Sequence, residues 1–168
     1  MHRLAAASLA ALLPLGALAG TCPWLGDDVA AQVILVRPTE VKLEKDPVPP
    51  NPKGLVSSTT CRFKGKDEGI GQLSVVVMDF GSEANAKARY EGELKSQGSR
   101  ARPSKLDGNP AFFTMNPGFS GGSFAQKGRW FVFVSHVFSK RVNEAAKKDP
   151  DGGSLSTHEV ARRVLEKL

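Results

Sequence analysis

A serine in a glycine-rich segment is the strongest candidate for chemistry in this chain. The run Gly118-Phe119-Ser120-Gly121-Gly122 matches the G-x-S-x-G pattern of serine hydrolases, in which a sharp strand-to-helix turn exposes the nucleophile. Here a strand pattern follows the motif, and the chain is much shorter than such hydrolases. His136 falls in a predicted strand and His158 in a predicted helix, so nothing in the spacing requires a triad. We predict no catalytic residue; a small serine hydrolase that uses Ser120 is the alternative.

Metal and cofactor sites lack the residues that they need. The chain has two cysteines and three histidines, too few and too far apart for structural zinc. No Gly-Lys-Ser or Gly-Lys-Thr follows a glycine-rich loop, so no P-loop is expected. The acidic residues are too sparse for a calcium loop. We therefore predict no metal site and no cofactor.

The first residues have the composition of an export signal. A short basic start leads into a run of Leu and Ala that ends at Ala17-Leu18-Ala19, which predicts a signal peptide over residues 1–19 with cleavage before Gly20. No later window is apolar enough for a transmembrane helix. The chain is thus expected to be periplasmic or secreted, with residues 20–168 as a single domain.

The two cysteines fit an oxidising compartment. Cys22 and Cys61 are expected to form a disulfide that joins the N-terminal segment to the first central strand. The alternative is a lipid anchor on Cys22, but Thr21 suits a lipidation box poorly, and an anchor would leave Cys61 as an odd thiol.

The net charge of +6 suggests acidic partners. Arg100, Arg102 and Lys105 crowd one segment, and a second basic segment lies near residues 140–148. These segments either bind an anionic envelope polymer or form an ordinary solvated surface, and we favour the surface. Nucleic acid is not expected as a partner, because aromatic residues are not interleaved with the basic ones.

Phe119 is the aromatic residue best placed for contact with a partner. It stands with Ser120 in a Pro-Gly and Ser-Gly-Gly loop, whereas most other aromatic residues fall in predicted strands and are expected in the core. We take Phe119, Ser120 and the basic residues 100, 102 and 105 as candidate binding residues.

The periodicity of the chain predicts an α+β domain. Strands are expected near 59–63, 72–80 and 111–115, and as a hairpin over 123–138 with Lys127-Gly128 as its turn. Helices are expected from an Asp27 cap to about residue 35, from a Ser82 cap to residue 97, and near the C-terminus behind a capping box of Ser156 and Glu159. The proline-rich run 46–53 is expected to be an extended connection, and residues 149–153 a turn. Together these elements predict helices packed against one antiparallel-rich sheet.

Five short segments resemble the small secreted domains of the PsbP-like type, which include lipoprotein domains of unknown function. They are Cys22-Pro23-Trp24-Leu25, Cys61-Arg62-Phe63, the run 105–112, Lys127-Gly128-Arg129-Trp130 and the C-terminal helix 160–168. The resemblance implies an α/β/α sandwich that binds other proteins, with no catalytic residues. We therefore expect a non-catalytic exported domain that binds another envelope or exported protein, for example as an inhibitor or immunity protein of an envelope-acting enzyme.

Overall fold

The computed structural model describes residues 21–46, 54–65, 71–148 and 156–168. Three sequence predictions lie outside these residues: the signal peptide with its cleavage point, nearly all of the proline-rich run, and the turn at 149–153.

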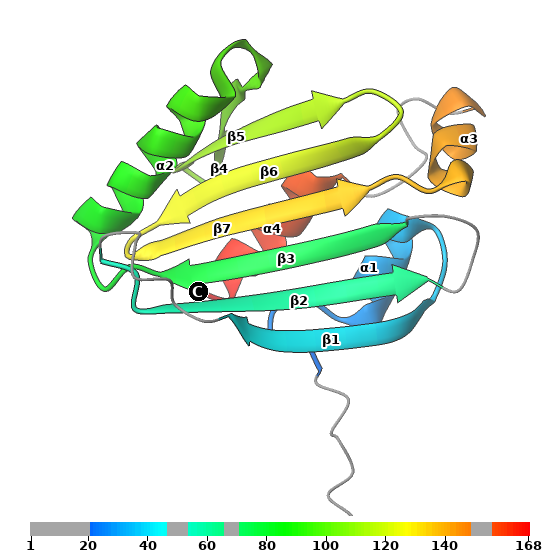
Figure 1. Ribbon diagram of the computed structural model, residues 1–168, viewed down its shortest axis with the longest axis horizontal. Coiled ribbons are helices and arrows are strands. Elements are labelled where there is room, and N and C mark those ends of the chain that lie inside the picture. Colours follow the sequence, from blue (N-terminus) through cyan, green and yellow to red (C-terminus); the bar gives the residue numbers. More distant parts are fainter. Residues whose placement is uncertain (1–20, 47–53, 66–70, 149–155) are drawn as a thin grey trace, which may run out of the picture.

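In this part of the chain, seven strands form one antiparallel sheet in the order β1-β2-β3-β7-β6-β5-β4 (Figure 1). The strands are β1 (Pro38–Asp46), β2 (Ser57–Gly65), β3 (Gln72–Asp79), β4 (Arg102–Leu106), β5 (Asn109–Asn116), β6 (Ser120–Lys127) and β7 (Trp130–Val137). The predicted α+β fold with a single antiparallel sheet is confirmed.

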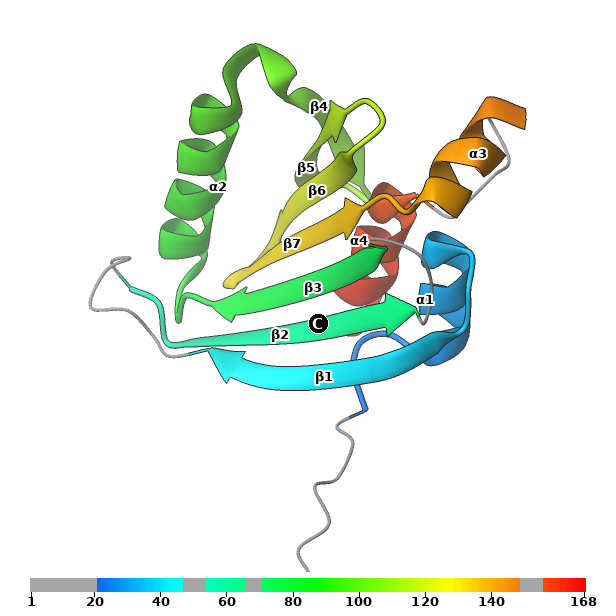
Figure 2. The ribbon, with the colours of Figure 1, turned by 45° about the vertical axis from the view of Figure 1, so that its right-hand side comes forward.

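Helices cover both faces of the sheet. They are α1 (Asp27–Ile34), α2 (Glu83–Gln97), the short 3-10 helix η1 (Gly98–Arg100), α3 (Lys140–Lys148) and α4 (Thr157–Glu166). Figure 2 shows α2 on one side of the sheet, α1 and α4 on the other, and α3 beyond the end of β7. The architecture is therefore three layers with two separate cores.

The alternation of side chains along β7 divides the two cores. Val132 and Val134 lie in the core under α1 and α4, whereas Phe131 and Phe133 pack in the core under α2. Successive side chains of a strand point to opposite faces, so a strand that is apolar at nearly every position must be covered on both sides. The predicted hairpin, formed by β6 and β7, is confirmed.

Capping residues define the ends of α2. Ser82 Oγ accepts a hydrogen bond from the backbone N–H of Asn85 at 3.3 Å, and Gly98 follows the last helical residue with a φ of 53°. Side-chain acceptors satisfy free N–H groups at a helix start, and glycine adopts positive φ at a helix end without strain. The predicted bounds of this helix are confirmed.

A disulfide joins the N-terminal segment to the sheet. Cys22 and Cys61 are bonded with their Cα atoms 5.7 Å apart and 39 positions apart in the sequence. Cys61 lies on β2 in the core under α1 and α4, and Cys22 packs against the same core. The predicted pairing is confirmed, so Trp24 and Leu25 are held next to the sheet.

Local details of three predicted elements need correction. The cap of α1 is Gly26, and Asp27 belongs to the first turn. The β6–β7 loop is Gly128-Arg129, because Lys127 pairs with Trp130 and Gly128 supplies the positive φ of 51°.

The capping box of α4 is half formed. Ser156 Oγ accepts from the backbone N–H of Glu159 at 3.1 Å. The Glu159 carboxylate does not return to Ser156, because it accepts hydrogen bonds from Arg162 and Arg163.

Candidate functional site

The G-x-S-x-G segment forms a hairpin turn and not a nucleophile elbow. Ser120 begins β6 opposite Val137, while its neighbour Gly121 lies opposite His136. Adjacent side chains of a strand point to opposite faces, so Ser120 and His136 are on different sides of the sheet. The structure does not bring this serine and histidine together.

A different serine–histidine pair exists, and the sequence analysis missed it. Ser104 Oγ on β4 and His158 Nε2 at the start of α4 are 2.9 Å apart. His158 Nδ1 is buried and has no hydrogen-bond partner in the described chain, whereas a triad histidine needs an acceptor at that atom. Burial lowers the pKa of His158, against the opposing effect of Glu159. We interpret the pair as a structural hydrogen bond between β4 and α4. No sequence motif could have revealed it, because 54 positions separate the two residues.

Four apolar side chains gather at the end of the sheet where Phe119 lies, and we call them the β5–β6 patch. The patch consists of Phe113, Met115, Phe119 and Phe138. Phe119 is 69% exposed, Met115 55% and Phe113 37%, and Phe138 is partly buried. Sequence analysis singled out Phe119 alone, since Phe113 reads as a core residue of a strand.

Strand alternation places Phe113 and Met115 on one face of β5, and a backbone hydrogen bond joins Phe119 to Phe138 beyond the end of the β6–β7 pairing. Met115 lies opposite Gly121, and Gly121 lies opposite His136. A Cβ added to Gly121 would lie 3.5 Å from Phe138 Cζ and 3.8 Å from Met115 Sδ. Gly121 therefore lies beneath the patch, and the Phe138 ring and the Met115 thioether both pack over it.

Backbone hydrogen bonds fix the turn that carries Phe119. The N–H of Phe119 donates to Asn116 O at 3.0 Å, and its carbonyl accepts from Phe138 N–H at 2.7 Å. Asn143 Nδ2 of α3 donates to Gly118 O at 3.0 Å. The exposed ring thus projects from a held backbone, which lowers the entropy lost when a partner binds.

A buried histidine lies next to the patch. His136 is 2% exposed, and its ring meets the Phe138 ring edge-on with centroids 5.0 Å apart. His136 Nε2 is buried with no hydrogen-bond partner in the described residues. Desolvation by burial lowers the pKa of His136 to about 4, so the ring is neutral near pH 7.

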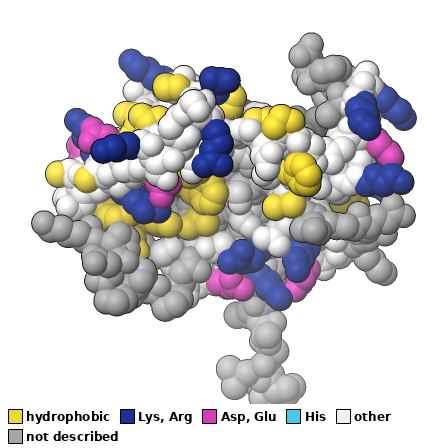
Figure 3. Space-filling view, turned by 45° about the horizontal axis from the view of Figure 1, so that its top comes forward, with side chains coloured by type: hydrophobic (Ala, Val, Ile, Leu, Met, Phe, Trp, Pro, Cys, Tyr) yellow, Lys and Arg dark blue, Asp and Glu magenta, His cyan; other side chains and the backbone are white. Residues whose placement is uncertain are grey.

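The basic candidates do not form a single surface. Arg102 lies opposite Phe113, on the face of the patch, whereas Lys105 lies opposite Pro110 on the other face of β4. Arg100 ends η1 and is exposed. Figure 3 shows Lys and Arg side chains spread around separate hydrophobic areas and not collected in one stripe. Of the predicted residues, the structure brings Arg102 next to the patch and leaves Lys105 apart from it.

Helix α3 adds positive charge beside the patch. It carries four exposed basic residues and one carboxylate, Glu144; the basic residues are Lys140, Arg141, Lys147 and Lys148. Asn143 joins α3 to the turn before Phe119, so α3 lies beside the patch, while Arg141 donates to Leu35 O and Lys140 pairs with Glu144. Its surroundings therefore favour an acidic partner surface.

The described residues contain no cluster of three or more side chains suited to a metal ion. They also contain no helix with the length and apolar character to cross a membrane. Comparison of the chain with protein-family models, curated proteins and solved structures found no match.

Proposed function

We propose that this protein is a non-catalytic, exported binding domain that docks another protein on the β5–β6 patch. The observation that carries the proposal is Phe119, which exposes 69% of its surface from a turn whose backbone bonds Asn116 and Phe138. Large apolar side chains that are exposed together are typical of interaction surfaces, and aromatic residues contribute strongly to binding energy there.

The charges around the patch define the partner. Arg102 and the basic residues of α3 lie beside it, so the complementary surface is an apolar depression with an acidic rim. An envelope-acting enzyme that presents such a surface is a suitable target, with this protein as its inhibitor or immunity protein. The polymer-binding alternative is less well supported, because Arg102 and Lys105 point away from each other.

The disulfide supports export, since structural disulfides persist in oxidising compartments. The signal peptide over residues 1–19 and the PsbP-like resemblance stay predictions.

Affinity capture with paired variants tests the proposal. The purified protein is compared with F119S and M115S, and with V56S as a matched control. Val56 is 62% exposed and hydrogen-bonds Asp79 at the opposite end of β3, so its substitution removes a similar exposed side chain far from the patch. We expect one stoichiometric envelope protein, captured by the wild type and V56S and lost with F119S and M115S.

Two outcomes would contradict the proposal. Capture that is equal for all four proteins would place the contact elsewhere. Capture of anionic polymers alone, abolished by moderate salt, would favour the polymer-binding alternative.

A further inference from the structure

A pocket of about 300 Å³ lies between α1 and α4, on a surface that the proposed docking site does not use. Trp24 and Val29 form its apolar wall, and the charged lining is Arg162, Arg163 and Glu166 of α4 together with Lys167, which follows the helix. This volume is at the lower end of the range for small-molecule sites and suits a ligand of one or two rings. The disulfide of Cys22 fixes the segment that carries Trp24.

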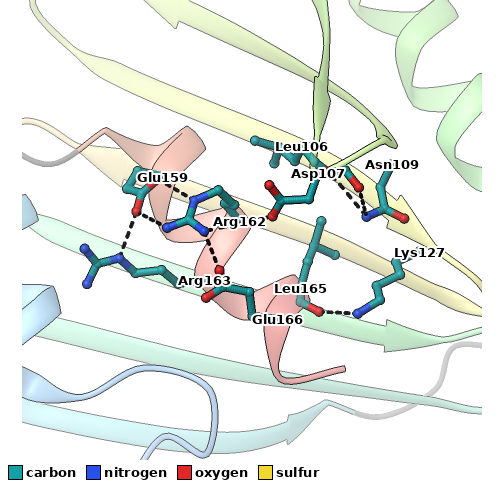
Figure 4. Close-up of polar contacts among 9 residues, drawn as sticks. All are labelled: Leu106, Asp107, Asn109, Lys127, Glu159, Arg162, Arg163, Leu165 and Glu166. Carbon is teal, nitrogen blue, oxygen red and sulfur yellow. Dashed lines mark hydrogen bonds and ion pairs between the residues drawn. The ribbon is translucent and has the colours of Figure 1, made fainter.

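The Glu159 carboxylate on α4 positions the Arg163 side chain in the pocket. Glu159 Oε1 accepts from Arg163 Nε at 3.0 Å and from Arg162 Nη2 at 2.7 Å, and Glu159 Oε2 accepts from Arg162 Nε at 2.8 Å. Hydrogen bonds, first from Arg162 and then from Arg163, lower the pKa of Glu159 to about 2. The Arg163 side chain is thus held at Nε, and Figure 4 shows its terminal nitrogens directed away from Glu159.

The two arginines differ in the donors that they have left. Arg162 also forms ion pairs with Glu166 and with Asp107, so its guanidinium is surrounded by carboxylates. Among the described residues, no partner is recorded for the terminal nitrogens of Arg163 or for the ammonium of Lys167. Within the lining, Arg162 pairs with Glu166 Oε1, so the donors that remain for a ligand are the terminal nitrogens of Arg163 and the Lys167 ammonium.

The helix that carries these groups is anchored at its end. Lys127 Nζ donates to Leu165 O at 2.7 Å, and the same carbonyl accepts from the backbone N–H of Leu168 at the end of α4 (Figure 4). Val164 and Leu165 are buried in the core beneath. The cationic groups therefore project from a fixed element, as a binding site requires.

We propose that this pocket binds a small organic anion in which a carboxylate is joined to a flat apolar group. The free edge of the Arg163 guanidinium offers two parallel N–H donors to the carboxylate, and the Lys167 ammonium adds a second charge. The Trp24 indole and Val29 contact the apolar part. This site is independent of the proposed docking function.

A titration followed by ¹H–¹⁵N NMR tests the proposal with 2-naphthoate as the probe and 2-naphthalenemethanol as its neutral control. The chain has two tryptophans, so a W24F spectrum assigns the Trp24 indole resonance. We expect naphthoate to shift that resonance in a saturable way and naphthalenemethanol to bind about tenfold more weakly.

Substitutions identify the groups that bind the anion. K167Q and R163Q are each expected to weaken naphthoate binding by about fivefold to tenfold. K147Q removes the same charge from α3 and is expected to change nothing. Because Arg163 also bonds Glu159, K167Q is the deciding variant if R163Q unfolds. The proposal is overturned if Trp24 does not respond, if the neutral control binds equally, or if K147Q weakens binding as much as K167Q does.

Discussion

Acidification is expected to destabilise the fold through His136. The ring is 2% exposed and its pKa falls from 6.5 to about 4 because burial penalises the charged form. Below pH 6.5 the His136 imidazole is protonated in the unfolded chain, whereas in the folded chain it stays neutral until the pH approaches 4. Stability from this residue is therefore fully present above pH 6.5 and is lost as the pH falls through that window.

The size of the effect follows from the separation of the two pKa values. Between about pH 7 and about pH 4.5, His136 should remove about 2.5 kcal/mol from the free energy of unfolding, at 1.36 kcal/mol per pH unit. Urea denaturation at a series of pH values, followed by tryptophan fluorescence, measures this loss. H136L is the control, since it fills the same buried position without titrating.

The difference between the two proteins isolates His136. Glu159 and His158 titrate in both, so their contributions cancel in the comparison. We expect the wild-type stability to fall below that of H136L by a margin that grows as the pH is lowered. Parallel curves would refute the reasoning, because they would mean that His136 accepts a proton in the folded state at little cost.

Two further predictions concern the stability of the fold, through the disulfide and through the core under α2. Reduction of the Cys22–Cys61 disulfide should lower the free energy of unfolding by about 4 kcal/mol, because the unfolded chain gains the entropy of an open loop of this length. Urea titrations with and without reductant measure the loss. Unchanged stability would mean that the reduced unfolded chain is already constrained. F112A should cost about 4 kcal/mol in the same assay, because Phe112 is fully buried and stacks on Phe124 with centroids 4.4 Å apart. A loss below about 1 kcal/mol would show that the core under α2 collapses around the missing ring.

Elements with strong local signals were predictable from the sequence. Apolar residues at nearly every position of β7 indicate a strand that is buried on both faces. Ser82 and Gly98 mark the ends of α2. The disulfide was predicted from two cysteines in a chain whose first residues are expected to be an export signal. These signals depend on neighbours in sequence, which periodicity and capping describe well.

The missed elements have weak local signals. In β1 the core side chain is Val41, and charged residues occupy most other positions because this strand is a sheet edge. β4 is the opposite edge and contains Pro103, which argues against a strand in the sequence. α3 is largely polar and basic, so the pattern reads as a charged loop.

The sites depend on tertiary packing that no local pattern contains. Phe113 looks like a core residue, but it is 37% exposed, and its contact with α4 is the His158 ring, which it meets edge-on. The pocket joins residues near position 24 with residues near position 163. In both cases the helix placement decides which side chains remain accessible.

Site-specific photo-crosslinking in the cell tests the docking surface most directly. A photoreactive amino acid replaces Phe119 in one protein and Val56 in another, and the cross-linked products are mapped by mass spectrometry. We expect position 119 to cross-link to one envelope protein, at an apolar site with acidic neighbours, and position 56 not to cross-link to it. Equal cross-linking at both positions, or none at position 119, would contradict it.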